Sequence, residues 1–379
     1  MLKRFAVALI LMALVFSNAY TQGKFSGHVF ADYYYNITRD ASFNPNQTAP
    51  ANAAISGSAP GNKTMQAFQI RRVFFTYDYD ISEQFSSRFR LEADQSANAS
   101  NGKIGVAVKD AYLKWKNIFS GSDLIFGIQP PPAFDVSEAL WGYRSVEKTI
   151  MDLRVIVSSR DQGISLRGKL TDDGMFNYCV MIANNSSNAP ETDKYKRYYA
   201  QIYIKPIANL QTTIYYDYKA QSEIAHAYQT GRQLNNAVST FALFAGYSQP
   251  SQYTFGIEGF FSITSNGLKD TVAKSYSSKN SLGLSVFGSY YILPELAAIV
   301  RYDRYSPSME EKGTDPVYVG AAASNNVNRD YIIVGVAYKV DKNVSIIPNI
   351  LYEMYDPPKG TKSPDASMTA RFTLYYVFL

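Results

Sequence analysis

Apolar and polar residues alternate with a period of two along most of the chain, and residues 85–94 show the pattern clearly. Phe89 and Leu91 share one parity in this segment, whereas Arg88 and Glu92 share the other. A strand places alternate residues on opposite faces, while a helix would distribute these charges around its axis. The pattern therefore predicts β-strands that have one apolar face and one polar face.

About sixteen segments follow this pattern of alternation. They span residues 24–36, 66–81, 83–95, 105–118, 122–130, 161–171, 174–186, 194–206, 209–221, 235–248, 252–263, 279–292, 295–305, 329–341, 343–355 and 368–379. Connections after even-numbered segments are short, whereas those after odd-numbered segments are longer and rich in Asn, Ser, Pro and Gly. This regularity places every short turn at one end of an antiparallel sheet and every long loop at the other, as in outer-membrane barrels.

We therefore predict an all-β fold, a transmembrane antiparallel β-barrel of about sixteen strands. Lipid offers no hydrogen bonds to the backbone, so a sheet within a bilayer has to close on itself. The composition agrees, because the mean hydropathy is −0.19 although 15% of the residues are aromatic and 31 are tyrosines. An apolar outer face averaged with a wet inner face gives neutral hydropathy, and tyrosine suits the two membrane interfaces.

The N-terminus has the features of a secretory signal peptide over residues 1–19. Two basic residues precede an apolar run from Phe5 to Phe16, and small residues before position 20 predict cleavage after Ala19. A membrane anchor is the alternative, but this run is shorter than the ~20 residues that a spanning helix needs. Residues 20–379 would then be exported and form the barrel in the outer membrane of a Gram-negative-type bacterium.

The charged face of each strand is expected to line a water-filled lumen. The pore-lining candidates on these faces are Arg72, Arg88, Arg90, Glu92, Asp94, Asp110, Lys114, Lys116, Arg167, Lys169, Arg301, Asp303 and Arg371. Over all strands the inward-facing bases and acids are nearly equal in number. This balance predicts a weakly selective pore with at most a slight preference for anions.

The Arg71-Arg72 pair breaks the alternation, because neighbouring residues in a regular strand face opposite sides. An arginine facing lipid at mid-depth would cost ~2–4 kcal/mol. A β-bulge between the two residues would let both face the lumen, together with Gln69 and Phe74. The alternative places Arg71 at the outer rim, with its side chain extended toward water.

Residues 130–160 form a long third loop whose composition differs from that of the other loops. Three prolines open it, and Asp135 and Ser145 could each begin a short helix. Its apolar residues would be exposed outside the barrel, so we expect the loop to fold into the lumen and narrow the pore. An external loop packed on its neighbours is the alternative. The constriction-loop candidates are Phe134, Asp135, Glu138, Trp141, Tyr143, Arg144, Glu147 and Lys148.

Residues 71–150 also resemble a known family of channels. The Arg71-Arg72 pair opens one strand, the next strand ends near Glu92-Ala93-Asp94, and an Asp-Ala-Tyr strand follows at 108–116. A glycine then leads into the prolines of 124–135, and 141–150 contains an Arg-Ser pair. These motifs resemble the phosphate-selective porin O/P family of outer-membrane channels. The resemblance implies a porin, usually a homotrimer, whose third loop folds inward.

The favoured function is passive diffusion of small hydrophilic or anionic solutes through an outer-membrane porin. One alternative is a phosphate- or anion-specific porin, and another is a closed barrel whose extracellular loops bind a partner. Small inward-facing residues such as Gly256, Ser262 and Gly283 favour a wet lumen over a closed one. The expected partners are outer-membrane lipid, the solute and further copies of the chain.

Other classes of function fit the sequence poorly. A barrel enzyme would need a histidine-based nucleophile or base, and His28 and His226 are not placed for that role. One cysteine and two histidines argue against a metal or haem site. The balanced charge argues against nucleic-acid binding. We therefore expect no enzyme activity, no cofactor and no metal.

Overall fold

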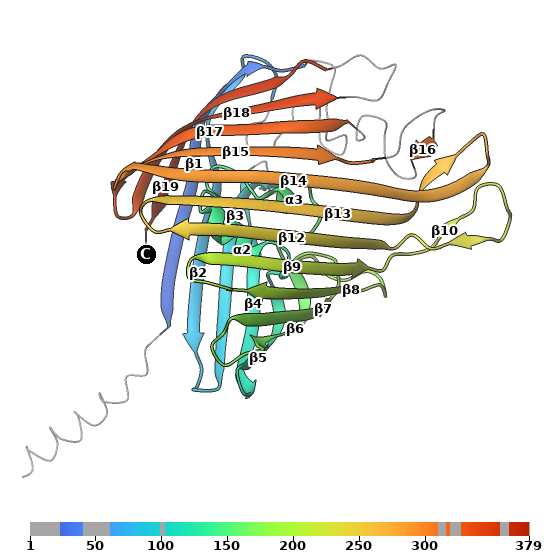
Figure 1. The fold of residues 1–379 in the computed structure, drawn as a ribbon, viewed down its shortest axis with the longest axis horizontal. Helices are drawn as coiled ribbons and strands as arrows, with labels where there is room; N and C mark the ends of the chain where they lie inside the picture. Colours follow the sequence, from blue (N-terminus) through green and yellow to red (C-terminus); the bar gives the residue numbers. More distant parts are fainter. Residues whose placement is uncertain are drawn as a thin grey trace, which may run out of the picture.

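The computed structural model describes residues 23–40, 61–98, 103–309, 316–318, 327–356 and 364–378. The signal peptide predicted at residues 1–19 lies outside these ranges. Within them the chain forms a closed antiparallel barrel of sixteen strands, which confirms the predicted fold class (Figure 1). No helix in the described ranges is long and apolar enough to cross a membrane.

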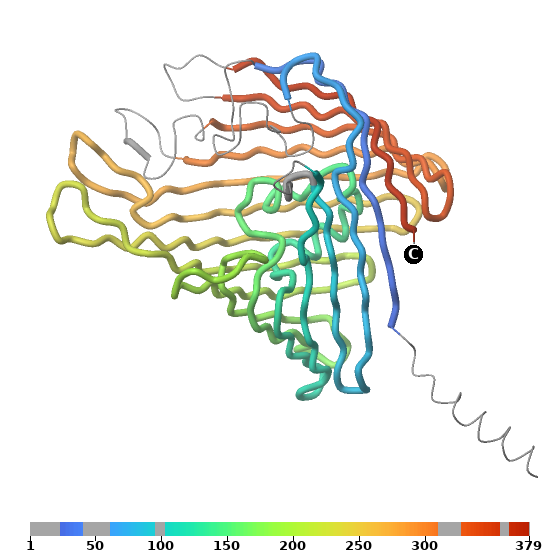
Figure 2. The backbone as a smooth tube through the Cα atoms, turned by 180° about the vertical axis from the view of Figure 1, so that it is seen from behind, coloured from blue at the N-terminus to red at the C-terminus, as the bar shows by residue number. Residues whose placement is uncertain are grey.

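The barrel strands agree closely with the predicted segments. They are β1 (Lys24–Thr38), β2 (Gln66–Asp80), β3 (Phe85–Asn98), β4 (Ile104–Phe119), β5 (Ser122–Gln129), β6 (Asp161–Lys169), β7 (Phe176–Ala183), β8 (Arg197–Ile204), β9 (Leu210–Lys219), β12 (Val238–Gln249), β13 (Tyr253–Asp270), β14 (Ser275–Leu293), β15 (Leu296–Ser306), β17 (Asn328–Asp341), β18 (Val344–Asp356) and β19 (Ser367–Val377). Each pairs with its neighbours along the chain, and β1 closes the barrel by pairing with both β2 and β19 (Figure 2).

Short turns and longer connections lie at opposite ends of the barrel, as predicted. The turns between β12 and β13 and between β14 and β15 lie at one end, and the β13–β14 hairpin extends from the other (Figure 1). The prediction of a loop over 264–278 is wrong, because β13 and β14 continue as paired strands to Asp270 and Ser275. This extension is polar, and the alternation that marks lipid-facing strands is not required there. Two smaller pieces, the β10–β11 hairpin (Ile224–Ala225 and Gln233–Leu234) and β16 (Pro316–Tyr318), lie near this end.

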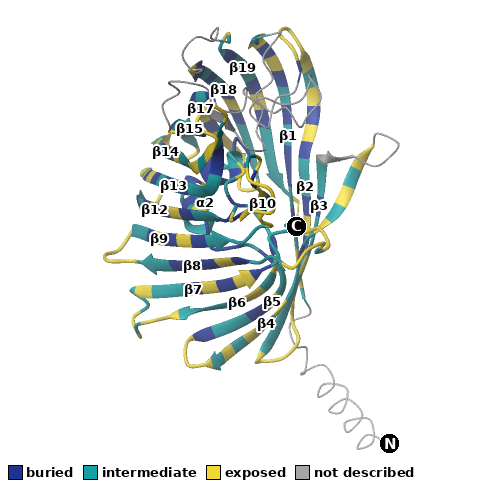
Figure 3. Cartoon of the chain, turned by 90° about the vertical axis from the view of Figure 1, so that its right-hand side faces the viewer, coloured by how far each residue is buried: buried dark blue, intermediate teal, exposed yellow. Residues whose placement is uncertain are grey.

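The two faces of the wall differ as the alternation predicts. Large apolar side chains are exposed on the outer face, among them Phe68, Phe126 and Leu243. Many polar and charged side chains are instead buried on the inner face, and burial alternates along the strands (Figure 3). An apolar exterior on a closed sheet is the surface that a lipid bilayer requires.

A β-bulge in β2 explains the arginine pair. Ile70 lies opposite Ala31 of β1, and Arg72 lies opposite Phe30, so Arg71 is the extra residue. Arg71 is buried while Ile70 is exposed on the outer face. The predicted bulge is therefore confirmed, and the alternative with Arg71 at the outer rim is wrong.

A second bulge, which we did not predict, lies two strands away in β4. Val108 pairs with Leu91 of β3 and Asp110 pairs with Arg90, so Lys109 is the extra residue. The bulge turns Lys109 and Asp110 toward the lumen together, where Lys109 forms an ion pair with Glu92. The two bulges thus add inward-facing charge to the same part of the wall.

Candidate functional site in the barrel lumen

The third loop lies inside the barrel, as expected. It contains α2 (Asp135–Trp141) and α3 (Ile150–Leu153). α2 ends at Gly142, whose φ of 70° is a left-handed conformation that glycine adopts at little cost. An external loop is excluded, because side chains of the loop pack against the inner faces of many strands.

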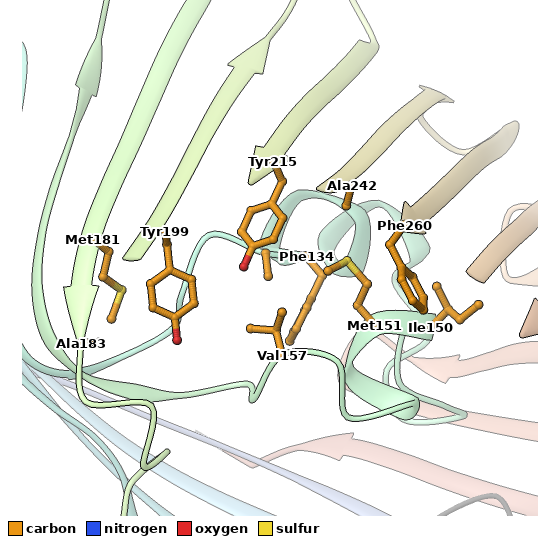
Figure 4. Close-up of a cluster of buried hydrophobic side chains, with 11 residues drawn as sticks. Phe134, Ile150, Met151, Val157, Met181, Ala183, Tyr199, Tyr215, Ala242 and Phe260 are labelled. Carbon is orange, nitrogen blue, oxygen red and sulfur yellow. The ribbon is translucent and has the colours of Figure 1, made fainter. Parts of the chain in front are cut away.

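Three clusters of apolar side chains hold the third loop inside the barrel. Phe134, Ile150, Met151 and Val157 pack against Met181, Tyr199, Tyr215 and Phe260 of the wall (Figure 4). Val146 packs in a second cluster with inward-facing residues of β15, β17 and β18. Trp141 packs in a third with Phe244 and Phe287. Part of the inner wall is thus apolar and covered by the loop, so the prediction that the lumen-facing side of the strands is polar does not hold there.

Two inward-facing glycines that favour a wet lumen in the sequence have another role in the structure. A Cβ at Gly256 would lie 2.4 Å from Cζ of Phe287, and one at Gly283 would lie 2.1 Å from Cε1 of Phe260. Both rings lie in the clusters beneath the third loop. The glycines therefore leave space for aromatic rings that support the loop.

Three arginines of the wall hold the backbone of the loop. Arg71 donates to the carbonyl oxygen of Ser145, Arg371 donates to that of Val146, and Arg301 donates to that of Lys148. Carboxylates fix the arginines, because Asp32 contacts Arg71 and Arg371 while Asp303 contacts Arg301. We call these three side chains the arginine anchors.

Two of these anchors were pore-lining candidates. Arg301 is 1% exposed, Arg371 is 3% exposed, and Asp303 is fully buried. The loop covers them, so they support its position instead of bordering open space. Sequence alternation identifies the inner face, but it does not show which part of that face the loop will cover.

The helix starts differ in part from the prediction. Asp135 is the first residue of α2, and Phe134 precedes it as the cap. Ser145 does not begin a helix, because the amides of Val146 and Glu147 bond to the carbonyl oxygen of Tyr143 and form a turn. α3 begins only at Ile150, with Thr149 as its cap. Binding of Arg71 to the Ser145 carbonyl accompanies this turn.

Three candidates of the third loop, Phe134, Trp141 and Glu147, are buried, and the others are partly exposed. The indole nitrogen of Trp141 donates to the carbonyl oxygen of Glu147 at 3.0 Å. The side chain of Glu147 accepts a hydrogen bond from Tyr331. Burial raises the pKa of Tyr143 to about 12. Phe134, Trp141, Tyr143 and Glu147 therefore fix the loop to the wall, whereas Asp135, Glu138 and Arg144 border open space.

Between the third loop and the neighbouring strands β19 and β1 to β4 lies a cavity of about 260 Å³ that we call the cationic cavity. Its lining includes the pore-lining candidates Arg72 and Arg90 and the loop candidates Glu138 and Arg144. It also includes His28, Phe30, Phe74, Lys109, Gly142, Ser145, Ser159, Arg160 and Tyr375. Lys109 and Arg160 were missed, although the adjacent charges Lys109-Asp110 repeat the signal of Arg71-Arg72.

Acidic groups hold the cations of the cavity in place. Glu92 contacts Arg72 at 2.9 Å and Lys109 at 2.7 Å, and Asp94 contacts Arg72 at 3.4 Å. Asp110 forms ion pairs with Arg90 and Arg160. The predicted acids Glu92, Asp94 and Asp110 thus lie around the cavity as partners of its bases.

On the loop side, Arg144 binds two carboxylates. Its guanidinium contacts Glu138 at 2.7 Å and Asp152 at 2.9 Å, and Lys148 lies 3.7 Å from Asp152. Burial by itself would raise the pKa of Asp152, but Arg144 and Lys148 outweigh it and hold that pKa below its ordinary value. Asp152 was not predicted, and it keeps the basic groups of the loop oriented.

The other candidates lie in separate places. Arg88 and Lys114 line a space of about 430 Å³ near the short β2–β3 turn, and Lys116 contacts Asp80 at 2.5 Å. Arg167 contacts Asp135 at 3.5 Å at the start of the third loop. Lys169 is exposed at the end of β6. The predicted pore-lining set therefore divides into the cationic cavity, the space near the turn, the loop entrance and the buried anchors.

Comparisons with known proteins support the fold. No family model matches the chain, and no curated protein matches its sequence. Among solved structures, the outer membrane channel DcaP of Acinetobacter baumannii has a TM-score of 0.64 at 15% identity, covering 94% of this chain and 97% of that one. An anion-selective porin from Comamonas acidovorans has a TM-score of 0.60 at 11% identity, covering 94% and 99%. The trimer form of OmpT from Vibrio cholerae has 0.57 at 12%, covering 94% and 99%.

Proposed function

We propose that this protein is an outer-membrane porin, a passive diffusion channel for small hydrophilic solutes. The observation that carries the proposal is a closed barrel with an apolar exterior and an inward-folded third loop that leaves a charged cavity beside it. Such a loop narrows the pore and restricts passage by size. The likeness of nearly the whole chain to channel and porin structures supports this use of the fold.

The cationic cavity supports a mild preference for anions. Arg72, Arg90, Lys109, Arg144 and Arg160 line it, and Glu138 is the one acid among the described residues of its lining. The acids around it offset much of this charge, which favours weak selectivity over exclusion of cations. The anion-selective porin among the structural neighbours is consistent with this direction.

Three finer points belong to the same proposal. The chain would be exported by residues 1–19 and inserted in the outer membrane, with lipid around its apolar face. It would assemble as a homotrimer, a form in which one neighbour is described. It would be a member of the phosphate-selective porin O/P family, which rests on the motifs at 71–150.

Conductance measurements test the proposal. The purified protein in planar bilayers is expected to give stable single-channel currents, with a reversal potential in a potassium chloride gradient that indicates modest preference for chloride. Complete absence of conductance would contradict the porin and favour a closed barrel with binding loops. Strong anion preference with block by phosphate would favour the second candidate, an anion-specific channel, for which the five lining cations are the supporting observation.

A further inference from the structure

The cationic cavity has two chemically different sides. One side presents the five basic groups named above. The other presents rings from three neighbouring strands, namely His28 and Phe30 of β1, Phe74 of β2 and Tyr375 of β19. The basic side is sufficient for a pore that only passes small ions. The aromatic side adds nothing to that role, because exposing phenylalanine rings to water is unfavourable.

The basic side is held rigidly before any solute arrives. Glu92 and Asp110 are 7% and 1% exposed, and each bridges two of the lining bases. Because these carboxylates lie behind the bases, the bases are directed toward the cavity. Because these donors are already fixed, binding an anion costs little further conformational entropy of the side chains.

The aromatic side is a continuous set of rings. The centroid of Phe74 lies 4.6 Å from that of His28 and 5.7 Å from that of Phe30. Tyr375 lies 5.7 Å from Phe30. Phe30 and Phe74 are separate from the apolar clusters beneath the third loop in the described part of the chain, so supporting the loop does not explain them.

The two sides meet at Phe74. The guanidinium carbon of Arg90 lies 5.8 Å from the centre of the Phe74 ring. Arg90 is fixed by a hydrogen bond of 2.7 Å from Nε to the hydroxyl of Thr76. Arg90 thus covers part of the Phe74 ring, and Phe30 and Phe74 are only 4% and 7% exposed, so an anionic group bound at Arg90 would lie beside the exposed edges of these rings.

We infer that the cationic cavity binds aromatic carboxylates, whose carboxylate contacts the basic side and whose ring packs on the aromatic side. This inference names a solute class for the proposed channel and rests on that function. The cavity of about 260 Å³ shares Glu138, Gly142, Arg144, Ser159 and Arg160 with an adjoining space of about 320 Å³, so it has room for a solute with a single ring. Aromatic contacts of ordinary strength would make such a solute bind about tenfold more tightly than acetate.

Calorimetry and conductance together test the inference. Benzoate, acetate and inorganic phosphate are titrated into the full-length protein in detergent micelles, and each is also tested for block of the chloride current. The variants are Phe74→Leu and Phe30→Leu, with Phe89→Leu as the matched control, because Phe89 faces outward on the adjacent strand. Heat-induced unfolding on gels verifies that each variant is a folded barrel.

We expect benzoate to bind about tenfold more tightly than acetate, and at least as tightly as phosphate. Phe74→Leu and Phe30→Leu should reduce the difference from acetate, and Phe89→Leu should leave it intact. Equal affinity for benzoate and acetate would overturn the inference, as would tighter binding of phosphate or insensitivity to both lumen variants. Benzoate binding without conductance would uphold the site and refute the porin. Conductance without preference for benzoate would uphold the porin and refute the site.

Discussion

Trp141 offers the sharpest test of how the third loop is held in the lumen. Its side chain is 2% exposed. Its ring lies 5.3 Å from Phe287 at an interplanar angle of 64°, and the Arg301 guanidinium lies 5.6 Å from it. The variant Trp141→Ala removes these contacts together with the indole hydrogen bond to Glu147.

The expected magnitude follows from this burial. Replacing a buried tryptophan by alanine destabilises a protein by ~3–5 kcal/mol. Here we expect this loss to weaken the free energy with which the third loop packs against the wall. The equilibrium constant for release of the loop would then rise by roughly 100-fold or more, since each ~1.4 kcal/mol is a factor of ten. Trp141→Phe retains much of the packing and is expected to have a smaller effect.

Single-channel recording and limited proteolysis measure the release. Trp141→Ala is expected to raise the mean conductance and its noise, and to let trypsin cleave after Arg144 or Lys148. Trp115→Ala is the control, because Trp115 is exposed on the outer face of β4. Wild-type conductance together with wild-type protease resistance in Trp141→Ala would refute the view that this residue holds the loop in place.

Two further predictions concern charged groups around the loop. Asp32→Asn leaves two buried arginines without their shared carboxylate, so we expect the free energy of unfolding to fall by ~3–5 kcal/mol, measured by thermal unfolding with circular dichroism. The control Asp123→Asn, in a partly exposed ion pair, should change it by less than ~1 kcal/mol. Equal effects of the two variants would contradict this reasoning. Because the pKa of Asp152 is depressed, its stabilising charge is present above the ordinary carboxyl range and is lost only as pH falls through the lowered value. Asp152→Asn should increase anion preference at neutral pH, and its difference from the wild type should stay constant from about pH 7 to about pH 5. A difference that shrinks before about pH 5 would count against the assignment.

The barrel could be predicted from the sequence because lipid imposes a local rule on every strand. Leu91 faces lipid and its neighbour Glu92 faces inward, and this facing depends on the local strand and not on contacts with distant segments. The rule ends where lipid ends, which is why alternation predicts a loop at the polar extension of β13 to Asp270. The paired arginines at the β2 bulge were detectable because an arginine in lipid is costly.

The functional site could be predicted only in part, because it depends on contacts between distant segments. Alternation identified Arg301 as facing inward, but only the position of the third loop shows that it binds the carbonyl of Lys148. Alternation also gave Gly256 as a small inward residue without showing that the ring of Phe287 occupies the space beside it. Lys109-Asp110 carries the same signal as the arginine pair, because a regular strand would turn one of two adjacent charges toward lipid, but we did not apply that reasoning to it.

The two bulges have a consequence for how much chemistry a barrel wall can present. A regular strand offers the lumen one side chain for every two residues, or roughly one per 6.8 Å of its length. Inserting one residue at Arg71 or Lys109 places two consecutive side chains inward and leaves the alternation intact on both sides. A barrel of fixed strand number and diameter can therefore raise the density of functional groups at a chosen depth by single-residue insertion, a change that substitution within a regular strand does not achieve.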